Sequence, residues 1–202
     1  ALQGTSGQTL TVNGDLTLNV NSQMNVSLGM SNQTALFDVA GNLTLAGTLN
    51  ITDGGGFGAG YYHLVNYQGS LTDHTMVIGA APAGIDPSRI WIDTSVDHQV
   101  NLTSATGVRL NVWDGGDLAN HNNGRIDGGS GDWDTTNNNW TDNQEKVNGR
   151  YDQGSFAVFS GKAGTVHIDD SKANILAAGI QFATDGYVLT GSALNLDNTA
   201  QP

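Results

Sequence analysis

The chain has 202 residues, of which 38% are hydrophobic and 13% are charged, and its formal net charge is −12. Nucleic acid and anionic membrane surfaces are poor partners for so acidic a chain, because both are bound through basic side chains that displace counterions. No apolar run reaches the ~18 residues needed to span a bilayer, and the absence of cysteine excludes disulfides and thiolate metal sites.

Short runs in which apolar and polar residues alternate follow one another along the chain. This period of two is typical of half-buried β-strands, and Gly, Asn or Asp between the runs marks turns. The best helical candidate, residues 171–178, is short and leads directly into another strand-like segment. We therefore expect an all-β fold, with strands at residues 9–12, 15–20, 24–28, 42–45, 48–51, 89–92, 100–103 and 108–112.

One strand motif repeats along the sequence. GDLTL at residues 14–18 recurs 27 residues later as GNLTL at residues 41–45, and a weaker echo follows at residues 191–196. A β-sandwich and a β-solenoid both suit many short strands with polar turns. The 21 Asn and 20 Thr residues favour the solenoid, because stacked coils place like side chains in hydrogen-bonded ladders. With roughly 20–27 residues per coil, we expect about 8–10 coils.

The alternating pattern is interrupted after Val112. Residues 113–154 are rich in Gly, Asn and Asp and contain three of the four Trp residues, and alternation resumes at residues 155–159. We place a boundary here, which gives a first β-helix module at residues 1–112 and a second at residues 113–202. The second module is expected to open with a loop-rich insertion, residues 113–154.

Two blocks of this sequence resemble the passenger domains of bacterial autotransporters, the proteins of type V secretion. The first block, similar to the passenger-associated strand repeat, is VAGNLTLAGTLNIT at residues 39–52, followed by GGFGAGYY at 55–62 and LVNY at 64–67. The second, similar to another passenger module, comprises WDG at 113–115, DGGSG at 127–131, NWT at 139–141, FAVF at 156–159 and GIQFATDGY at 179–187. Their order and spacing cover most of the chain.

The resemblance implies a right-handed parallel β-helix on a bacterial cell surface, anchored through a translocator barrel outside these residues. The resemblance also implies a signal peptide upstream of these residues, while residues 1–4 themselves lack its basic and apolar regions. The absence of cysteine suits such a passenger, which crosses the outer membrane unfolded and would be obstructed by a disulfide.

The resemblance also implies a non-enzymatic adhesin fragment or stalk that needs no cofactor. Its expected partners are host cell-surface or extracellular-matrix proteins or glycans. Two alternatives stay open. Passengers could associate with one another and aggregate bacteria into biofilm, or this part of the rod could be a scaffold for passenger folding.

No catalytic residues are predicted, because the five histidines lack metal-ligand spacing and neither a His-Glu-x-x-His nor a Gly-x-Ser-x-Gly motif occurs. A weak calcium candidate is formed by Asp127, Asp132 and Asp134 around GGSGDWD at residues 128–134. It departs from the calcium-binding nonapeptide in the position of its Asp and occurs once, so a polar turn is the alternative interpretation.

Trp133 and Trp140 lie in the polar segment and are candidate partner-binding residues, because exposed aromatic side chains among Asn and Asp suit contact with a protein or glycan. The alternative is that they fold inward and cap the core. The tripeptide Asn-Gly-Arg occurs twice, at residues 123–125 and 148–150. Asn-Gly deamidates easily, and the product can mimic an integrin ligand, although two copies in an Asn- and Gly-rich segment are expected by chance.

Overall fold

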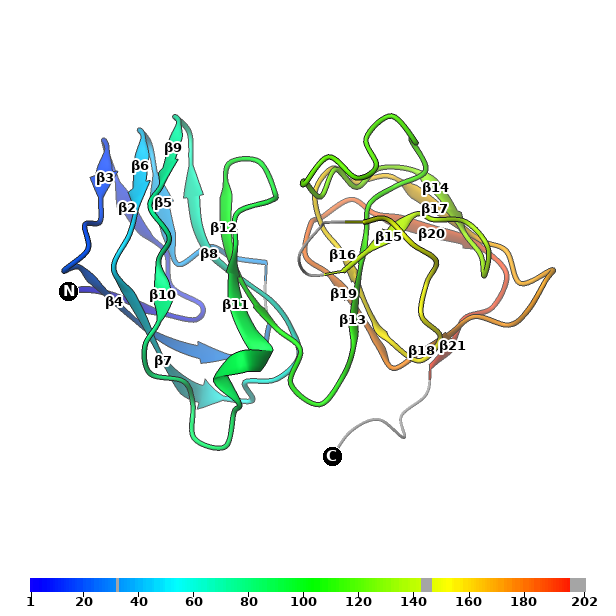
Figure 1. Ribbon diagram of the computed structural model, residues 1–202, viewed down its shortest axis with the longest axis horizontal. Coiled ribbons are helices and arrows are strands. Elements are labelled where there is room, and N and C mark those ends of the chain that lie inside the picture. The colour runs from blue at the N-terminus through cyan, green and yellow to red at the C-terminus, as the bar shows by residue number, and fades with distance from the viewer. Residues whose placement is uncertain (32, 143–146, 197–202) are drawn as a thin grey trace. The chain divides into compact units, whose positions relative to one another are not determined.

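The computed structural model describes residues 1–31, 33–142 and 147–196. These residues form a β-solenoid of about 7 turns, with parallel strands stacked coil upon coil (Figure 1). The prediction of an all-β solenoid is confirmed, with fewer coils than the sequence suggested. The chain divides into two compact units, one formed by Ala1–Thr94 with His98–Thr106 and the other by Ser95–Asp97 with Gly107–Pro202.

Three parallel sheets form the sides of the first unit. Each coil contributes one short strand to each sheet, and polar turns form the corners between them. The sheets are β1-β4-β7-β10, β2-β5-β8 and β3-β6-β9. Their strands are β1 (Leu2–Thr5), β2 (Leu10–Val12), β3 (Leu16–Thr17), β4 (Gln23–Gly29), β5 (Phe37–Val39), β6 (Leu43–Leu45), β7 (Thr48–Gly55), β8 (Gly60–Tyr67), β9 (Leu71–Asp73) and β10 (Val77–Ile78).

The repeat seen in the sequence is the stack formed by β3, β6 and β9. Leu16 pairs in register with Leu43, which in turn pairs with Leu71. The 27-residue repeat is therefore confirmed as one coil. The third copy, GSLTD at residues 69–73, was not recognised, because Asp73 occupies the position at which the other copies have leucine.

The first unit ends with a reversal of strand direction. After the 3₁₀ turn η1 (Pro87–Arg89), strands β11 (Ile90–Asp93) and β12 (Gln99–Ser104) pair antiparallel with each other. Strand β12 also pairs antiparallel with β8. The hairpin therefore covers the edge of β8, to which a further parallel coil would otherwise add.

The second unit repeats the three-sided plan with sheets β13-β16-β19, β14-β17-β20 and β18-β21. Here the antiparallel addition is β15, which covers the free edge of β13. The strands are β13 (Leu110–Trp113), β14 (Gly131–Trp133), β15 (Trp140–Thr141), β16 (Phe156–Phe159), β17 (Thr165–Ile168), β18 (Leu176–Ala177), β19 (Gly179–Phe182), β20 (Val188–Gly191) and β21 (Asn195–Leu196).

The segment at residues 113–154 is one enlarged coil rather than an insertion of loops alone. Leu110 pairs with Phe156, 46 residues later, whereas Phe156 pairs with Gly179 after only 23 residues. Within the enlarged coil, β14 takes its place in a sheet and β15 reverses direction. The division between the units falls at Thr106 and Gly107, and Val112 lies within β13.

Each unit encloses its own core, and the two cores differ in composition. The first is mainly aliphatic and includes Leu43, Leu45 and Leu49, all fully buried. The second is mainly aromatic and includes Trp133 and Phe159. Burial of each such side chain contributes roughly 1.5–3 kcal/mol, so the inward residues of the alternating runs supply the main stabilisation of both stacks.

Candidate functional site

Trp133 and Trp140 are not surface anchors, because both side chains lie in the core of the second unit. Their exposed fractions are 0% and 1%. The two rings lie 4.8 Å apart between centroids, and both also contact Tyr151 and Phe159. The prediction of partner binding through these residues is therefore wrong, and the inward-folded alternative is the arrangement found.

The pairing of the strands explains why these residues point inward. Trp140 in β15 is the register partner of Trp113 in β13, so β15 places its ring on the core side of that sheet. Trp133 is the buried residue at the end of β14, directly after the exposed Asp132. The surrounding Asn, Asp and Gly residues form the turns that reverse the chain.

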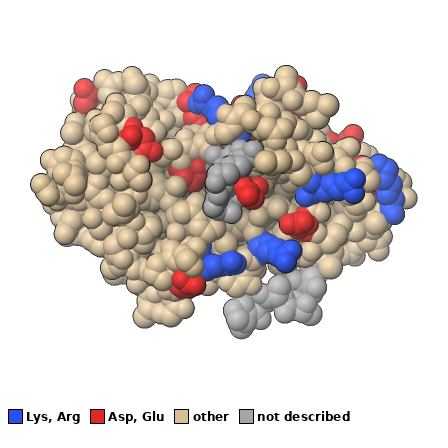
Figure 2. Space-filling model, viewed as in Figure 1, with Lys and Arg blue, Asp and Glu red and all other residues tan. Residues whose placement is uncertain are grey.

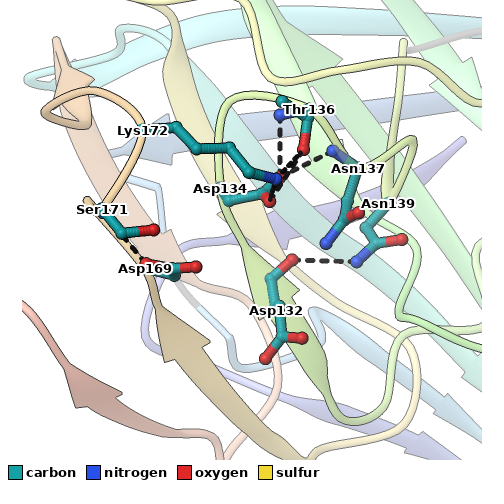
Figure 3. Close-up of polar contacts among 8 residues, drawn as sticks. All are labelled: Asp132, Asp134, Thr136, Asn137, Asn139, Asp169, Ser171 and Lys172. Carbon is teal, nitrogen blue, oxygen red and sulfur yellow. Dashed lines mark hydrogen bonds and ion pairs between the residues drawn. The ribbon is translucent and has the colours of Figure 1, made fainter.

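The Asp134 carboxylate is used to hold its own turn. It accepts hydrogen bonds from the backbone N–H groups of Thr136 at 2.8 Å and Asn137 at 2.6 Å. The Thr136 hydroxyl and the Lys172 ammonium also donate to it, the latter at 3.1 Å (Figure 3). Its side chain is 4% exposed, so little of this carboxylate remains open to a cation.

The three aspartates proposed for calcium do not converge. The Asp132 carboxylate points away from Asp134 (Figure 3). Asp127 instead accepts a hydrogen bond from the Asn123 side chain at 2.7 Å. Among the described residues, no group of three or more His, Cys, Asp or Glu side chains is arranged to hold a metal ion. The polar-turn interpretation of this segment is the one the structure supports.

A row of uncharged polar side chains lines the outer face of the sheet β1-β4-β7. Because alternate residues of a strand point to opposite faces, the polar positions of each coil share the solvent side while the apolar positions enter the core. Register stacks these positions into two columns, which together we call the ladder face: Gln3, Asn25 and Asn50 in one, and Thr5, Ser27 and Thr52 in the other.

Hydrogen bonds along the coils fix part of the ladder face. The Asn50 amide donates to Asn25 Oδ1 at 2.8 Å, and Asn50 Oδ1 accepts the backbone N–H of Ala80 at 3.0 Å. Within the described residues, the Asn25 amide nitrogen and the Gln3 side chain are left without a partner in the chain. An open hollow of about 290 Å³ lies over the six residues. The face therefore offers donors and acceptors to an incoming ligand, with the Asn25 and Asn50 side chains held in place by hydrogen bonds between coils.

The ladder face carries no charge, and its unit carries little. Among the first unit's residues, Arg89 is the only lysine or arginine and is accompanied by six aspartates, and none of the ladder positions is acidic or basic. Figure 2 shows the first unit, at the left, with few charged side chains on the face drawn. A ligand can thus be bound here by hydrogen bonds rather than by ion pairs. The hydrogen-bonding groups of successive coils lie ~4.8 Å apart.

A second ladder supports the first unit at the corner before β3, β6 and β9. Asp15 Oδ1 accepts the Asn42 backbone N–H at 2.7 Å, and Asn42 Oδ1 accepts the Ser70 backbone N–H at 2.9 Å. The chain packs closely here, since a Cβ added to Gly41 would lie 2.2 Å from Asp15 Oδ1. This ladder is occupied by its own backbone contacts and serves the stacking of the coils.

An apolar hollow of about 500 Å³ lies at another corner of the first unit, between β3-β6-β9 and β4-β7-β10. Val20 and Val77, 79% and 53% exposed, stand at its rim. Ala46 and Gly47 form the tight middle corner, and His74 contributes a polar group. Sequence reasoning missed this hollow, because it arises from unequal corner lengths in successive coils.

Fold and face together define a β-solenoid with a neutral hydrogen-bonding surface. The described residues contain no helix long and apolar enough to cross a membrane. The chain is 42% identical, over 197 residues, to the adhesin BmaC autotransporter of Brucella suis biovar 1 (strain 1330). This match covers 93% of the chain, and the resemblance to autotransporter passengers is confirmed.

The chain spans about 6% of the length of this curated relative. No family model matches the chain. No solved structure matches it either.

Proposed function

We propose that this chain is a non-enzymatic adhesive segment of an autotransporter passenger, displayed on the bacterial cell surface. The observation that carries the proposal is the 42% identity, along 93% of the chain, to a protein named an adhesin. The ladder face supports it, because it presents hydrogen-bonding groups on a rigid sheet. The partners it suits are proteins or glycans of host cells or extracellular matrix.

The mechanism is distributed contact rather than a single deep pocket. One net hydrogen bond contributes only ~0.5–1.5 kcal/mol, so each coil alone would bind weakly. Because the sheet holds successive groups at a fixed spacing, a ligand that engages one coil finds the next already positioned. Display of many copies on a cell would then multiply weak contacts into firm attachment.

Self-association is a second candidate, favoured by the same face. Two uncharged ladder faces could pair through their Asn and Thr side chains, whereas the net charge of −12 opposes close approach of two chains. Salt screens that repulsion, so clumping through this face should increase with ionic strength. A passenger-folding scaffold, the third candidate, requires neither kind of contact.

The experiment is attachment of beads coated with the purified chain to host cells and matrix proteins, with bead clumping scored in the same wells. The test variant is Asn25→Asp, which keeps the acceptor for the Asn50 amide and adds one negative charge to the ladder face. The matched control is Asn21→Asp, which makes the same change at an exposed corner.

We expect the beads to attach, and soluble chain to compete this attachment away. Asn25→Asp should weaken the attachment, whereas Asn21→Asp should leave it unchanged. Equal effects of the two variants would argue against the ladder face as the contact surface. Clumping without attachment would favour self-association. If the beads neither attached nor clumped, that result would contradict an adhesive role for this segment and would favour the scaffold.

A further inference from the structure

We propose that Asn123 is a site of spontaneous deamidation in the folded chain, whereas Asn148, in the same Asn-Gly-Arg tripeptide, is protected. The reaction converts the Asn123 carboxamide into a carboxylate, through a cyclic imide formed with the nitrogen of Gly124. Water is its only co-reactant. The inference does not depend on the adhesive function and rests on how the second unit holds the two tripeptides.

The nucleophile at the first tripeptide is accessible. Asn123 and Gly124 are both exposed, and no heavy atom outside residues 123–125 lies within 4 Å of the position that a Cβ on Gly124 would occupy. In the described part of the chain, the Gly124 amide makes no hydrogen bond. No hydrogen bond of the Gly124 nitrogen therefore has to be broken before that nitrogen can approach the Asn123 side chain.

The electrophile at the first tripeptide is held by two contacts that assist the reaction. Asn123 Oδ1 accepts the backbone N–H of Arg125 at 2.8 Å, which polarises the carbonyl and stabilises the oxyanion formed on attack. Asn123 Nδ2 donates to Asp127 Oδ2 at 2.7 Å, so a carboxylate stands beside the leaving nitrogen. Asp127 is itself fixed, because its backbone N–H donates to Asp114 at 2.8 Å.

The chemistry balances without an oxidant or reductant. The Gly124 nitrogen bonds to Cγ of Asn123 and gives up its proton, which the Asp127 carboxylate can carry to the departing amide. The Cγ–Nδ2 bond breaks, and ammonia leaves with that proton. Water then opens the imide at either carbonyl, giving aspartate with the original backbone or isoaspartate with the chain rerouted through the side chain.

The second tripeptide differs from the first in its burial and in its nucleophile, not in the kinds of contact that its Asn side chain makes. Asn148 is 8% exposed, and its amide donates to Asp114 Oδ2 at 2.7 Å while its Oδ1 accepts the Asn122 backbone N–H at 2.7 Å. The nitrogen of Gly149 donates to the Trp140 carbonyl at 2.6 Å. The attacking nitrogen is thus already bound to another carbonyl and the Asn148 side chain is buried, so reaction requires local opening of this network.

Deamidation would change the loop that carries it. The Asn123 amide now donates to Asp127, and a carboxylate at position 123 would instead repel it. The hydrogen bond from the Asp127 backbone N–H to Asp114 closes the same loop. The Asp127 amide should therefore become less protected from hydrogen exchange. Modification would therefore loosen the turn at residues 122–127 and add one negative charge to the surface.

The test uses the full chain, incubated folded near neutral pH in water labelled with heavy oxygen and followed by peptide mass spectrometry. We expect label at Asn123 at least ~tenfold faster than at Asn148, because Asn148 reacts only from an opened state. In urea the two rates should converge, since the tripeptides are identical. Equal rates in the folded chain, or faster labelling of Asn148, would overturn the proposal.

Two variants test the mechanism and its consequence. Asp127→Ala should slow labelling of Asn123 several-fold in the folded chain but not in urea, and an unchanged folded rate would overturn the assisted reaction. Asn123→Asp should speed hydrogen exchange at the Asp127 amide relative to the parent chain. Unchanged exchange there would overturn the loosening of the loop.

Discussion

At the scale of single residues, Asp134 shows how a polar segment is held rigid. Burial alone would raise its pKa, but donation from the backbone N–H groups of Asn137 and Thr136, the Thr136 hydroxyl and the Lys172 ammonium lowers the pKa to about 2. The folded chain therefore favours the ionised carboxylate more strongly than the unfolded chain does. The stabilisation is fully present above the ordinary pKa of 3.8 and disappears as pH falls through about 2.

We expect Asp134→Asn to remove a pH-dependent part of the stability of the second unit. The shift in pKa corresponds to roughly 2 kcal/mol in the free energy of unfolding, lost between about pH 4 and pH 2. The measurement is urea unfolding across that range, taken as the difference between parent and variant so that other carboxylates cancel. Lys172→Met is the control and should cost less, since the Lys172 side chain is 52% exposed. A parallel pH profile for parent and Asp134→Asn would contradict the assignment.

His63 in the first unit also makes stability fall with decreasing pH, but here the fold favours the neutral form of the side chain and the change lies at higher pH. His63 is 9% exposed, its Nδ1 lies 3.0 Å from the Gln33 carbonyl, and burial lowers its pKa below the ordinary 6.5. The unfolded chain therefore binds a proton more readily than the folded chain. We expect the free energy of unfolding to fall as pH decreases below 6.5 and His63→Gln to flatten that slope. Chemical unfolding between neutral and mildly acidic pH measures it, and an unaltered slope in the variant would count against His63.

At the scale of elements, the corner ladder limits which side chains a coil can carry. A Cβ on Gly41 would lie 2.2 Å from Asp15 Oδ1 and 2.7 Å from the carbonyl carbon of Gly14. Gly14 holds the same place in the preceding coil, yet a Cβ there would have nothing within 4 Å. The two glycines occupy the same position of the repeated motif. They differ in that only Gly41 has a preceding coil packed against it.

We therefore expect Gly41→Ala to cost about 2 kcal/mol of stability through forced separation of the coils, and Gly14→Ala to change it by less than about 0.5 kcal/mol. Thermal and urea unfolding of the two variants measure the difference. Equal stability of Gly41→Ala and Gly14→Ala would show that the corner can relax and would refute the close stacking.

Elements also mark how far the sequence could predict this structure. Period-two alternation and the repeat of Gly14 at Gly41 predicted the strands and their stacking, because inward and outward positions must match from coil to coil. Alternation carries no strand direction, so the antiparallel β12 and β15 could not be predicted. The polar neighbours of Trp133 indicated exposure, whereas strand pairing buried it. The ladder face was foreseen only as a general Asn and Thr surface, since its columns depend on register.

At the scale of the whole molecule, each unit has a separate hydrophobic core. Leu49 belongs to the aliphatic core and Phe159 to the aromatic one, and both are 0% exposed. Contacts in a solenoid are made mainly between neighbouring coils, so a cavity in one stack should leave the other intact.

We expect Leu49→Ala and Phe159→Ala to lower the stability of different parts of the chain by ~2–5 kcal/mol each. Hydrogen exchange read by peptide should show faster exchange within residues 1–94 for the first variant and within residues 107–196 for the second. Faster exchange throughout the chain in either variant would mean that the two units unfold as one.

The reversed strands β12 and β15 bear on how such a protein can change over evolutionary time. Coils stacked in parallel must keep a common phase, so an insertion in one constrains every coil after it. A strand that runs the other way ends this shared phase, because it occupies the sheet edge on which a further parallel coil would have to stack. Coils could thus be duplicated or deleted in one unit while the other kept its own repeat, allowing the length of a passenger to vary by genetic recombination.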